Sequence, residues 1–147
     1  MYSDRELLAR LIQCEAGGEG DIGMRAVATV VMNRVHAQSG EFARVSNGGS
    51  IRNIIFQNGQ FTCAMENVRG QYNPQNIYNM NPQDIHYAIA DWAISGGRHD
   101  ETADSLFFYN PYSDTCAYFF PKGGSGAFHI RVLNHCFYYP TDVYHQT

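Results

Sequence analysis

Glu15 is the residue whose type and position best suit acid–base chemistry. Leu8, Leu11 and Ile12 share one apolar face of a predicted helix, and Glu15 continues that face at i+4 from Leu11 and i+3 from Ile12. The carboxyl group therefore points inward, in the last helical turn, where the helix dipole disfavours a negative charge. Burial and the dipole are both expected to raise its pKa. A carboxylic acid that keeps its proton near neutral pH can act as a general acid.

Glu19 is the second carboxylate nearest to Glu15 in the sequence. It follows a double glycine and lies near the start of the next predicted helix, where the dipole favours the ionised form. It is a candidate partner that stabilises a positively charged transition state or orients Glu15. The alternative for Glu19 is a simple helix N-terminal charge. The alternative for Glu15 is a buried carboxylate paired with Arg34 or Arg52.

The helices that must position these residues are predicted from their termini. Ser3 and Glu6 form a capping box that opens the first helix, and Gly17 and Gly18 end it. Capping residues and apolar periodicity predict three further helices, with loops between them. The later helices are predicted at Asp21–His36, Ser50–Phe56 and Asn81–Ser95, and the loops at Ala37–Ser50 and Gln57–Asn81.

The C-terminal part of the chain has the composition of strands. Ser105–Asn110, Ala117–Phe120 and Ala127–Tyr139 are rich in aromatic and β-branched residues and are separated by Pro and Gly turns. Helices followed by strands predict an α+β fold, in which N-terminal helices pack with a small C-terminal antiparallel sheet. The length predicts one domain, 1–147.

Composition and charge exclude several classes of protein. A hydrophobic content of 44% and a charged content of 16% are typical of a globular chain. The net charge is −4 and the ten basic residues are scattered, so no nucleic-acid partner is expected. No apolar run is long enough to span a membrane. The N-terminal residues lack the features of a secretory signal peptide, so the protein is expected to be made in the cytoplasm.

The four cysteines are Cys14, Cys63, Cys116 and Cys136, and none forms a CxxC motif. Their spacing therefore argues against a zinc ribbon or a thioredoxin motif. Free thiols in a reducing cytoplasm are the favoured prediction. The alternative is a disulfide formed later, for which Cys116–Cys136 is the most plausible bridge between neighbouring strands.

Several blocks of sequence resemble the SleB/CwlJ-type cell wall hydrolases. They span almost the whole chain in the order of that family, and the last block is similar to the CwlJ branch of spore cortex-lytic enzymes. The chain also shows no peptidoglycan-binding module, as in that branch. The blocks are Leu8–Gly20, Gly23–Val35, Ile54–Gln57 with Gln60–Thr62, Phe107–Pro111, and His135–Tyr138 with Pro140–Thr141.

The resemblance implies a single lysozyme-like or lytic-transglycosylase-like domain in which Glu15 is the catalytic acid. The expected reaction is cleavage of the β-1,4 bond between N-acetylmuramic acid and N-acetylglucosamine in the spore cortex during germination. A lytic transglycosylase is favoured, because only Glu19 offers a second carboxylate. A muramidase-type hydrolase is the alternative. The resemblance also implies assembly into the spore coat near the cortex, with a coat protein as a partner.

Other residues are candidates for binding the glycan. Aromatic rings suit the faces of sugar rings, and amide or hydroxyl groups suit N-acetyl and hydroxyl groups. For each one the alternative is a purely structural role, as a turn signal, a loop anchor or a hydrogen-bonded core histidine. The candidates are Gln60, Phe61, Thr62, Tyr72, Tyr109, Asn110 and His135.

Three rival interpretations come from other functional classes. One is a cysteine hydrolase that uses Cys14 or Cys63 with His135 or His129. Another is a non-catalytic module that binds peptidoglycan or scaffolds the spore coat. The third is a metal site. No metal or cofactor is expected to be required, because the histidines lack metal-site spacing and no calcium-binding motif supports the calcium site that the Gln57–Asn81 loop could form. The histidines considered are His86, His99, His129 and His135.

Overall fold

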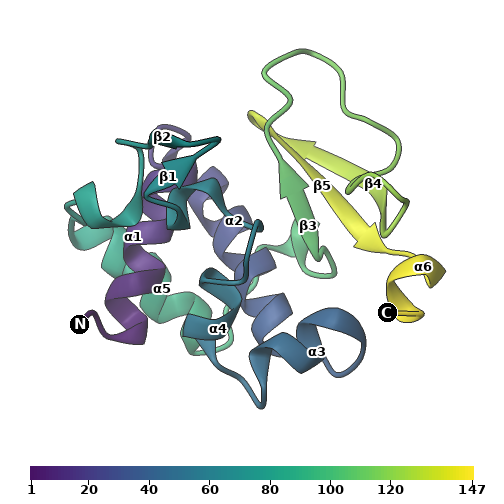
Figure 1. The fold of residues 1–147 in the computed structure, drawn as a ribbon, viewed down its shortest axis with the longest axis horizontal. Helices are drawn as coiled ribbons and strands as arrows, with labels where there is room; N and C mark the ends of the chain where they lie inside the picture. Colours follow the sequence, from purple (N-terminus) through teal and green to yellow (C-terminus); the bar gives the residue numbers. More distant parts are fainter.

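The computed structural model describes all 147 residues, and its helices and strands form an α+β fold, as predicted (Figure 1). A three-stranded antiparallel sheet has the order β3-β5-β4, and β1 and β2 form a separate small hairpin. The helices are α1 (Asp4–Ala16), α2 (Gly20–Val35), α3 (Gly40–Ser46), α4 (Ile51–Ile55), α5 (Asp84–Ile94) and α6 (Asp142–His145); the strands are β1 (Asn67–Val68), β2 (Gln71–Tyr72), β3 (Phe107–Tyr109), β4 (Gly126–Val132) and β5 (His135–Pro140); the 3₁₀ turns are η1 (Thr62–Ala64), η2 (Ile77–Asn79) and η3 (Asp100–Thr102).

Helix α1 begins and ends where the sequence predicts. The Ser3 hydroxyl accepts a hydrogen bond from the backbone N–H of Glu6 at 3.1 Å, and the helix ends at Ala16, before the double glycine. The reciprocal half of the capping box does not form, because the Glu6 carboxylate instead pairs with Arg10, one turn later, at 2.9 Å. The start of the helix is therefore set by Ser3.

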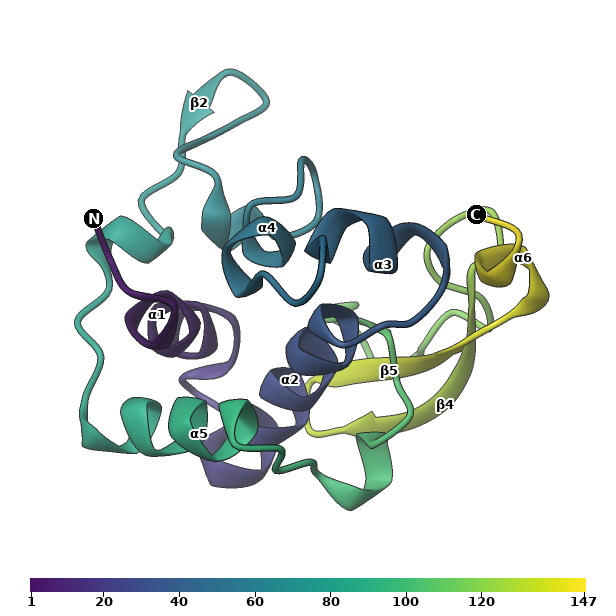
Figure 2. The same cartoon turned by 90° about the horizontal axis from the view of Figure 1, so that it is seen from below.

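Helix α2 is the central element of the fold. It packs against α1 and α5 on one side and reaches β3 and β4 on the other (Figure 2). Apolar side chains cover nearly all faces of its middle part, and Val27, Val30 and Val31 are fully buried. This is typical of a helix that is enclosed by other elements. Helix α2 therefore lies between α1, which carries Glu15, and the sheet. None of the helices has the length and apolar character needed to cross a membrane.

The predicted strand Ala127–Tyr139 is wrong in one respect: it is two strands, β4 and β5, joined by a turn at Leu133 and Asn134. Leu133 has a φ of 52°, a left-handed conformation that is unusual for a branched apolar residue. Leu-Asn is not one of the glycine-containing dipeptides that usually form two-residue hairpin turns, so the sequence did not predict this turn. The predicted strand Ala117–Phe120 is also wrong, because it contributes only one bridge, between Phe119 and Ala127.

The predicted loop Ala37–Ser50 contains the short helix α3, which the sequence pattern did not indicate. Its stability comes from the other end of the chain. The hydroxyl of Tyr144, on α6, accepts a hydrogen bond from the Phe42 N–H at 3.1 Å and donates one to the Ser39 carbonyl at 2.8 Å. The rings of Phe42 and Tyr144 also stack. A seven-residue helix is marginal alone, so these long-range contacts decide its formation.

The segment Gln57–Asn81 is largely irregular, as predicted, but it is well anchored. The side-chain amide of Asn73 donates hydrogen bonds to the carbonyls of Thr62 and Met65, each at 3.0 Å. The short hairpin β1–β2 and the turns η1 and η2 lie within this segment. The segment therefore forms a defined wall beside the end of α1.

The prediction of free thiols is wrong, because all four cysteines are paired. The bridges are Cys14–Cys63 and Cys116–Cys136, with Cα atoms 6.1 Å and 5.9 Å apart. Cys136 lies on β5, but Cys116 lies in a loop rather than on the neighbouring strand that the alternative assumed. Sequence spacing could not reveal the first bridge, since it depends on how η1 packs against α1.

Candidate active site

A cavity of about 660 Å³ lies between the C-terminal end of α1, the Gly59–Cys63 segment, β3 and the start of β5. Helix α1 contributes Glu15 from its last turn, and α2 contributes Arg34 from its own last turn. The cavity has the size typical of a ligand site. Seven of the residues predicted from the sequence line it: Glu15, Gln60, Phe61, Thr62, Tyr109, Asn110 and His135.

Two predicted residues do not line this cavity. Tyr72 lies on β2 and is 61% exposed, and its hydroxyl accepts a hydrogen bond from the Asn79 side chain at 2.8 Å. Strand β2 lies at the outer end of the hairpin, away from the sheet (Figure 2). Glu19 lies behind the cavity wall, where its side chain is only 7% exposed.

Glu15 has the electrostatic properties of a general acid. Burial and, to a smaller extent, the nearby charge of Glu19 raise the pKa of its carboxyl group, and the net value is about 7. His135 and Arg34 act in the opposite direction, because positive charge favours the ionised carboxylate. The effect of burial is the largest, so the carboxyl group still holds a proton in a substantial fraction of molecules at neutral pH.

Arg34 is a buried cation beside this carboxyl group. Its Nε donates to the Leu106 carbonyl at 2.7 Å and its Nη1 to the Gln60 Oε1 at 3.3 Å. Its guanidinium group also lies over the rings of Phe42 and Phe61, at 4.5 Å and 5.1 Å from their centroids. Burial lowers the pKa of Arg34 to about 10, so the group remains charged at neutral pH.

The structure does not support the alternative in which Glu15 is a salt-bridged structural residue. Glu15 and Arg34 line the same cavity, but they form no salt bridge. Arg52 is engaged elsewhere, since its Nη2 donates to the Tyr2 carbonyl at 2.5 Å. A carboxyl group with a raised pKa and no paired cation is typical of an acid–base catalyst.

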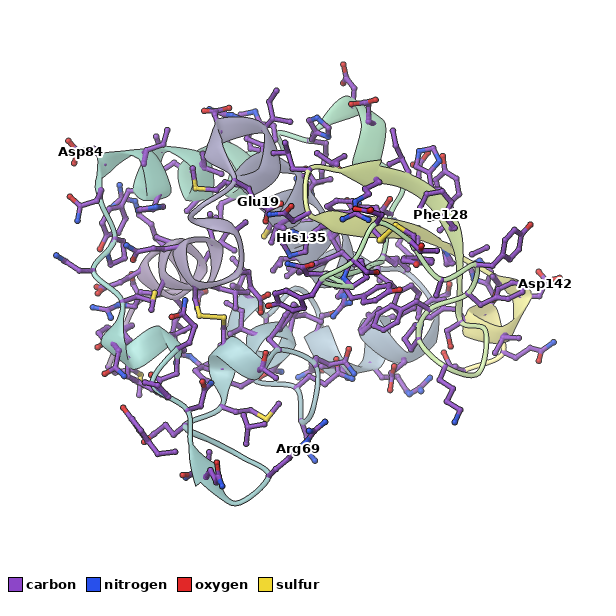
Figure 3. The ribbon with its side chains drawn as sticks, turned by 90° about the horizontal axis from the view of Figure 1, so that it is seen from above. Glu19, Arg69, Asp84, Phe128, His135 and Asp142 are labelled. Carbon is purple, nitrogen blue, oxygen red and sulfur yellow. A yellow bond between two sulfur atoms is a disulfide. The ribbon has the colours of Figure 1, made fainter.

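His135 and Glu19 form a close pair at the inner wall. The Nδ1 of His135 lies 2.6 Å from the Oε2 of Glu19, and the other oxygen of Glu19 accepts a hydrogen bond from the Asn134 N–H at 2.9 Å. Their side chains point toward one another between the start of α2 and the β4–β5 turn (Figure 3). His135 is therefore both a cavity-lining residue and a buried, paired residue, so the two interpretations of it are compatible.

The aromatic wall of the cavity is partly structural. The ring of Tyr109 stacks on Phe120 with centroids 4.4 Å apart, and its hydroxyl accepts a hydrogen bond from the Ala117 N–H. Phe61 packs against Phe108, with centroids 6.1 Å apart. These contacts hold the rings in place along the cavity.

Tyr112 is a cavity residue that the sequence analysis missed. It is 90% exposed at the edge of the cavity, with a left-handed φ of 52°. The side chain of Asn110 accepts a hydrogen bond from the Tyr112 N–H at 2.8 Å, so Asn110 shapes this turn as well as lining the site. The Asn-Pro-Tyr sequence was the available signal, because Asn before Pro favours a turn that exposes the next residue.

The structure bears on two of the rival interpretations. Cys14 and Cys63 are joined in a disulfide, so neither is a free nucleophile for a cysteine hydrolase. His129 lies outside the cavity, 2.8 Å from the Tyr139 hydroxyl and 2.9 Å from the Glu101 carbonyl. The structure contains no group of three or more His, Cys, Asp or Glu side chains arranged to hold a metal ion.

Comparison with known proteins identifies relatives over most of the chain. The model of a family described as Cell Wall Hydrolase matches residues 18–138, beginning just after Glu15. Cell wall hydrolase CwlJ of Bacillus subtilis is 32% identical over 139 residues, which cover 95% of this chain and 87% of that protein. CwlJ of Oceanobacillus iheyensis is 32% identical over 138 residues, which cover 92% of this chain and 86% of that protein.

A solved structure supports the fold. The catalytic domain of the germination-specific lytic transglycosylase SleB from Bacillus anthracis superposes with a TM-score of 0.62 at 23% identity, and the match covers 93% of this chain and 96% of that domain. The resemblance inferred from the sequence blocks is confirmed. The family match and the relatives at 32% identity show that this chain belongs to the cell wall hydrolase family and is an enzyme that cleaves the cell wall.

Proposed function

We propose that this enzyme is a lytic transglycosylase that cleaves the β-1,4 bond between N-acetylmuramic acid and N-acetylglucosamine in spore cortex peptidoglycan. The observation that carries this proposal is that Glu15 is the only carboxylate lining the cavity, and that its pKa is raised to about 7. Glycoside hydrolases generally need two carboxyl groups flanking the bond. A transglycosylase can act with one.

In the proposed reaction Glu15 acts first as an acid and then as a base. Its proton passes to the glycosidic oxygen as the bond from that oxygen to C1 of the muramyl residue breaks. The resulting carboxylate then accepts the proton of the muramyl C6 hydroxyl, whose oxygen forms the new bond to C1. The products are a 1,6-anhydromuramyl end and a free hydroxyl on the other sugar. Glu15 is again protonated, and no water is consumed.

The other parts of the site have roles in binding. Gln60, Thr62 and Asn110 offer amide and hydroxyl groups for the N-acetyl and hydroxyl groups of the glycan. Phe61 and Tyr109 supply apolar faces along the cavity. No metal or cofactor takes part in this scheme.

We place the enzyme in the spore coat, next to the cortex that it degrades during germination. Relatives named CwlJ and a Bacillus cereus relative named spore cortex-lytic enzyme, which is 32% identical over 113 residues and is covered by this chain over 37% of its length, support a cortex substrate. The two disulfides are consistent with assembly outside the reducing cytoplasm. A coat protein is the proposed partner.

The test is mass spectrometry of decoated spore cortex digested with three proteins. These are the wild type, Glu15→Gln, and Glu66→Gln as a matched control at an exposed carboxylate outside the cavity. We expect anhydromuramyl ends from the wild type and from Glu66→Gln, and a loss of at least about 10²-fold in Glu15→Gln.

Other products would change the proposal. Reducing muramyl ends would retain Glu15 as the acid but make the enzyme a muramidase-type hydrolase. Near-normal turnover by Glu15→Gln would contradict the mechanism. No new ends from a folded wild-type protein would favour a non-catalytic module that binds peptidoglycan or scaffolds the coat.

A further inference from the structure

A buried pair behind the cavity wall, Glu19 and His135, has a role that the acid–base scheme does not use. The two side chains are 7% and 5% exposed, and the Nδ1 of His135 lies 2.6 Å from the Oε2 of Glu19 (Figure 3). The other carboxylate oxygen accepts a hydrogen bond from the backbone N–H of Asn134. Glu19 thus contacts both the histidine and the turn that precedes it.

Close packing between α2 and the β4–β5 turn makes this pair possible. Gly23 lies one turn after Glu19 on α2, and a Cβ atom at this position would lie 2.6 Å from the Glu19 Cβ and 3.2 Å from the Leu133 Cδ1. A glycine is therefore needed for the turn to approach the helix. The turn then places Asn134 and His135 against the Glu19 carboxylate.

The pair determines which ring nitrogen of His135 carries the hydrogen. A carboxylate can only accept hydrogen bonds. At 2.6 Å an unprotonated Nδ1 would set its lone pair against those of Oε2, so the close approach favours a hydrogen on Nδ1, although the contact is an ion-pair approach rather than an aligned hydrogen bond. Nδ1 is therefore the protonated nitrogen, and in the neutral ring Nε2 is an acceptor.

The ring is also held in one orientation. It meets the Phe108 ring edge-on at 5.4 Å between centroids, and the Phe137 ring lies at 6.4 Å. Nδ1 is enclosed on the Glu19 side, while His135 borders the same cavity as Glu15. Nε2 is therefore the ring nitrogen available to a ligand in that cavity.

We infer that Glu19 is a positioning residue that fixes the tautomer of the neutral His135 ring, so that in this form Nε2 accepts a hydrogen bond from a hydroxyl or N-acetyl N–H group of the glycan bound beside Glu15. This inference rests on the proposed function, because the ligand is the glycan that Glu15 cleaves. It gives Glu19 a different role from the second catalytic carboxylate considered from the sequence. Glu19 acts through His135 and does not reach the reacting bond.

The first test is the tautomer itself, measured from the ¹⁵N chemical shifts of the His135 imidazole at a pH high enough for the ring to be neutral. We expect the Nδ1–H form in the wild type. In Glu19→Gln the side-chain oxygen can still accept from the Asn134 N–H, while the amide group now donates to Nδ1. The hydrogen should therefore move to Nε2 while the fold is kept. A wild-type ring in the Nε2–H form, or a Glu19→Gln ring with an unchanged tautomer, would overturn the inference.

The second test separates binding from chemistry on soluble glycan strands. We expect Glu19→Gln to raise KM by roughly 10-fold with a smaller change in kcat, the scale of losing one hydrogen bond. His135→Gln should retain more affinity than His135→Ala, because its side-chain oxygen can replace Nε2 as the acceptor. Asn134→Ala is the matched control, since only the backbone N–H of Asn134 bonds to Glu19.

The outcomes distinguish the inference from the proposed function. Normal KM in a Glu19→Gln protein whose tautomer has changed would overturn the inference while leaving the Glu15 mechanism in place. An inactive wild type would overturn the proposed function, and with it the glycan as the ligand of Nε2. The tautomer measurement would still report whether Glu19 controls the ring.

Discussion

The carboxyl group of Glu15 and the guanidinium group of Arg34 line one cavity without forming a salt bridge. Arg34 directs its donors at the Leu106 carbonyl and the Gln60 side chain instead. Its charge lowers the pKa of Glu15, but burial outweighs this effect and leaves a pKa of about 7. Near neutral pH the carboxyl group of Glu15 is therefore protonated in a substantial fraction of molecules and ionised in the rest, as the proposed acid–base role requires.

The pH dependence of cleavage should follow the ionisation of Glu15. The donor must be protonated, and its pKa is raised from 4.5 to about 7. We therefore expect kcat/KM to fall as the pH rises through about 7, because the fraction of molecules with a protonated Glu15 falls there. The measurement is initial rates on soluble glycan strands from about pH 5 to pH 9. A rate that rises through pH 7 would show that Glu15 is not the proton donor. Any residual activity of Glu15→Gln should lack this dependence.

Replacing Arg34 should shift the pH at which kcat/KM falls. Because the positive charge lowers the pKa of Glu15, Arg34→Met should raise that pKa and shift the falling limb to higher pH. Arg34→Lys keeps the charge and should leave the limb closer to its wild-type position.

Both Arg34 variants should also be less stable than the wild type. Arg34→Met leaves the Leu106 carbonyl without its donor and should lower the free energy of unfolding by about 1–3 kcal/mol, measured in urea. If the pH at which kcat/KM falls shifted equally in Arg34→Lys and Arg34→Met, the cause would be a change in packing rather than the loss of charge.

Tyr112 should contribute to glycan binding. It is 90% exposed at the edge of the cavity, where its ring is free to stack on a sugar. We expect Tyr112→Ala to raise KM several-fold on long glycan strands with little change in kcat, since the proposed acid–base chemistry does not use this side chain. Tyr118→Ala is the matched control, because Tyr118 is 73% exposed but does not border the cavity. Equal effects of the two substitutions would argue against a binding role.

The Cys14–Cys63 bridge should stabilise both the fold and the cavity. It joins the residue next to Glu15 to the wall formed by η1, across a sequence separation of 49 residues. Loop entropy predicts a contribution of about 4 kcal/mol for this bridge, and of about 3 kcal/mol for Cys116–Cys136, which closes 20 residues. Urea unfolding of the two double alanine variants measures both values.

The two bridges should differ in their effect on activity. Loss of Cys14–Cys63 should lower kcat/KM below its value in the Cys116–Cys136 variant, at temperatures where both proteins are folded. The reason is that Cys14 and Cys63 themselves border the cavity, whereas Cys116 and Cys136 do not. Equal activities would show that the first bridge does not shape the site.

Local signals predicted the parts of the fold that depend on neighbouring residues. Ser3 begins α1, Ser50 caps α4, and the apolar face of α1 directs Glu15 inward. Each of these depends on hydrogen bonds or side-chain spacing within a few residues, which the sequence displays directly. Helix α5 was predicted with its start three residues early, because Gln83 and His86 form its cap rather than Asn81 and Pro82.

Long-range contacts decided the features that were missed. Helix α3 depends on Tyr144, and the turn at Leu133 depends on its packing against Gly23 and on the bond from Asn134 to Glu19. In each case the stabilising partner lies more than a hundred residues away in the sequence. A pattern of neighbouring residues therefore cannot reveal such a partner.

The sequence by itself indicated the family through its motif blocks, and the α+β class through helices that are followed by strands. It also indicated the candidate acid, because Glu15 extends an apolar helical face. Only the tertiary structure decided what surrounds that acid. In the fold, seven of the predicted residues line one cavity, together with Arg34 and Tyr112, whereas Tyr72 lies outside it. The fold also places Glu19 behind His135 rather than beside Glu15. The physical reason is that the pKa of Glu15 depends on its burial and on the charges of residues from several helices and strands. These elements come together only when the chain is folded.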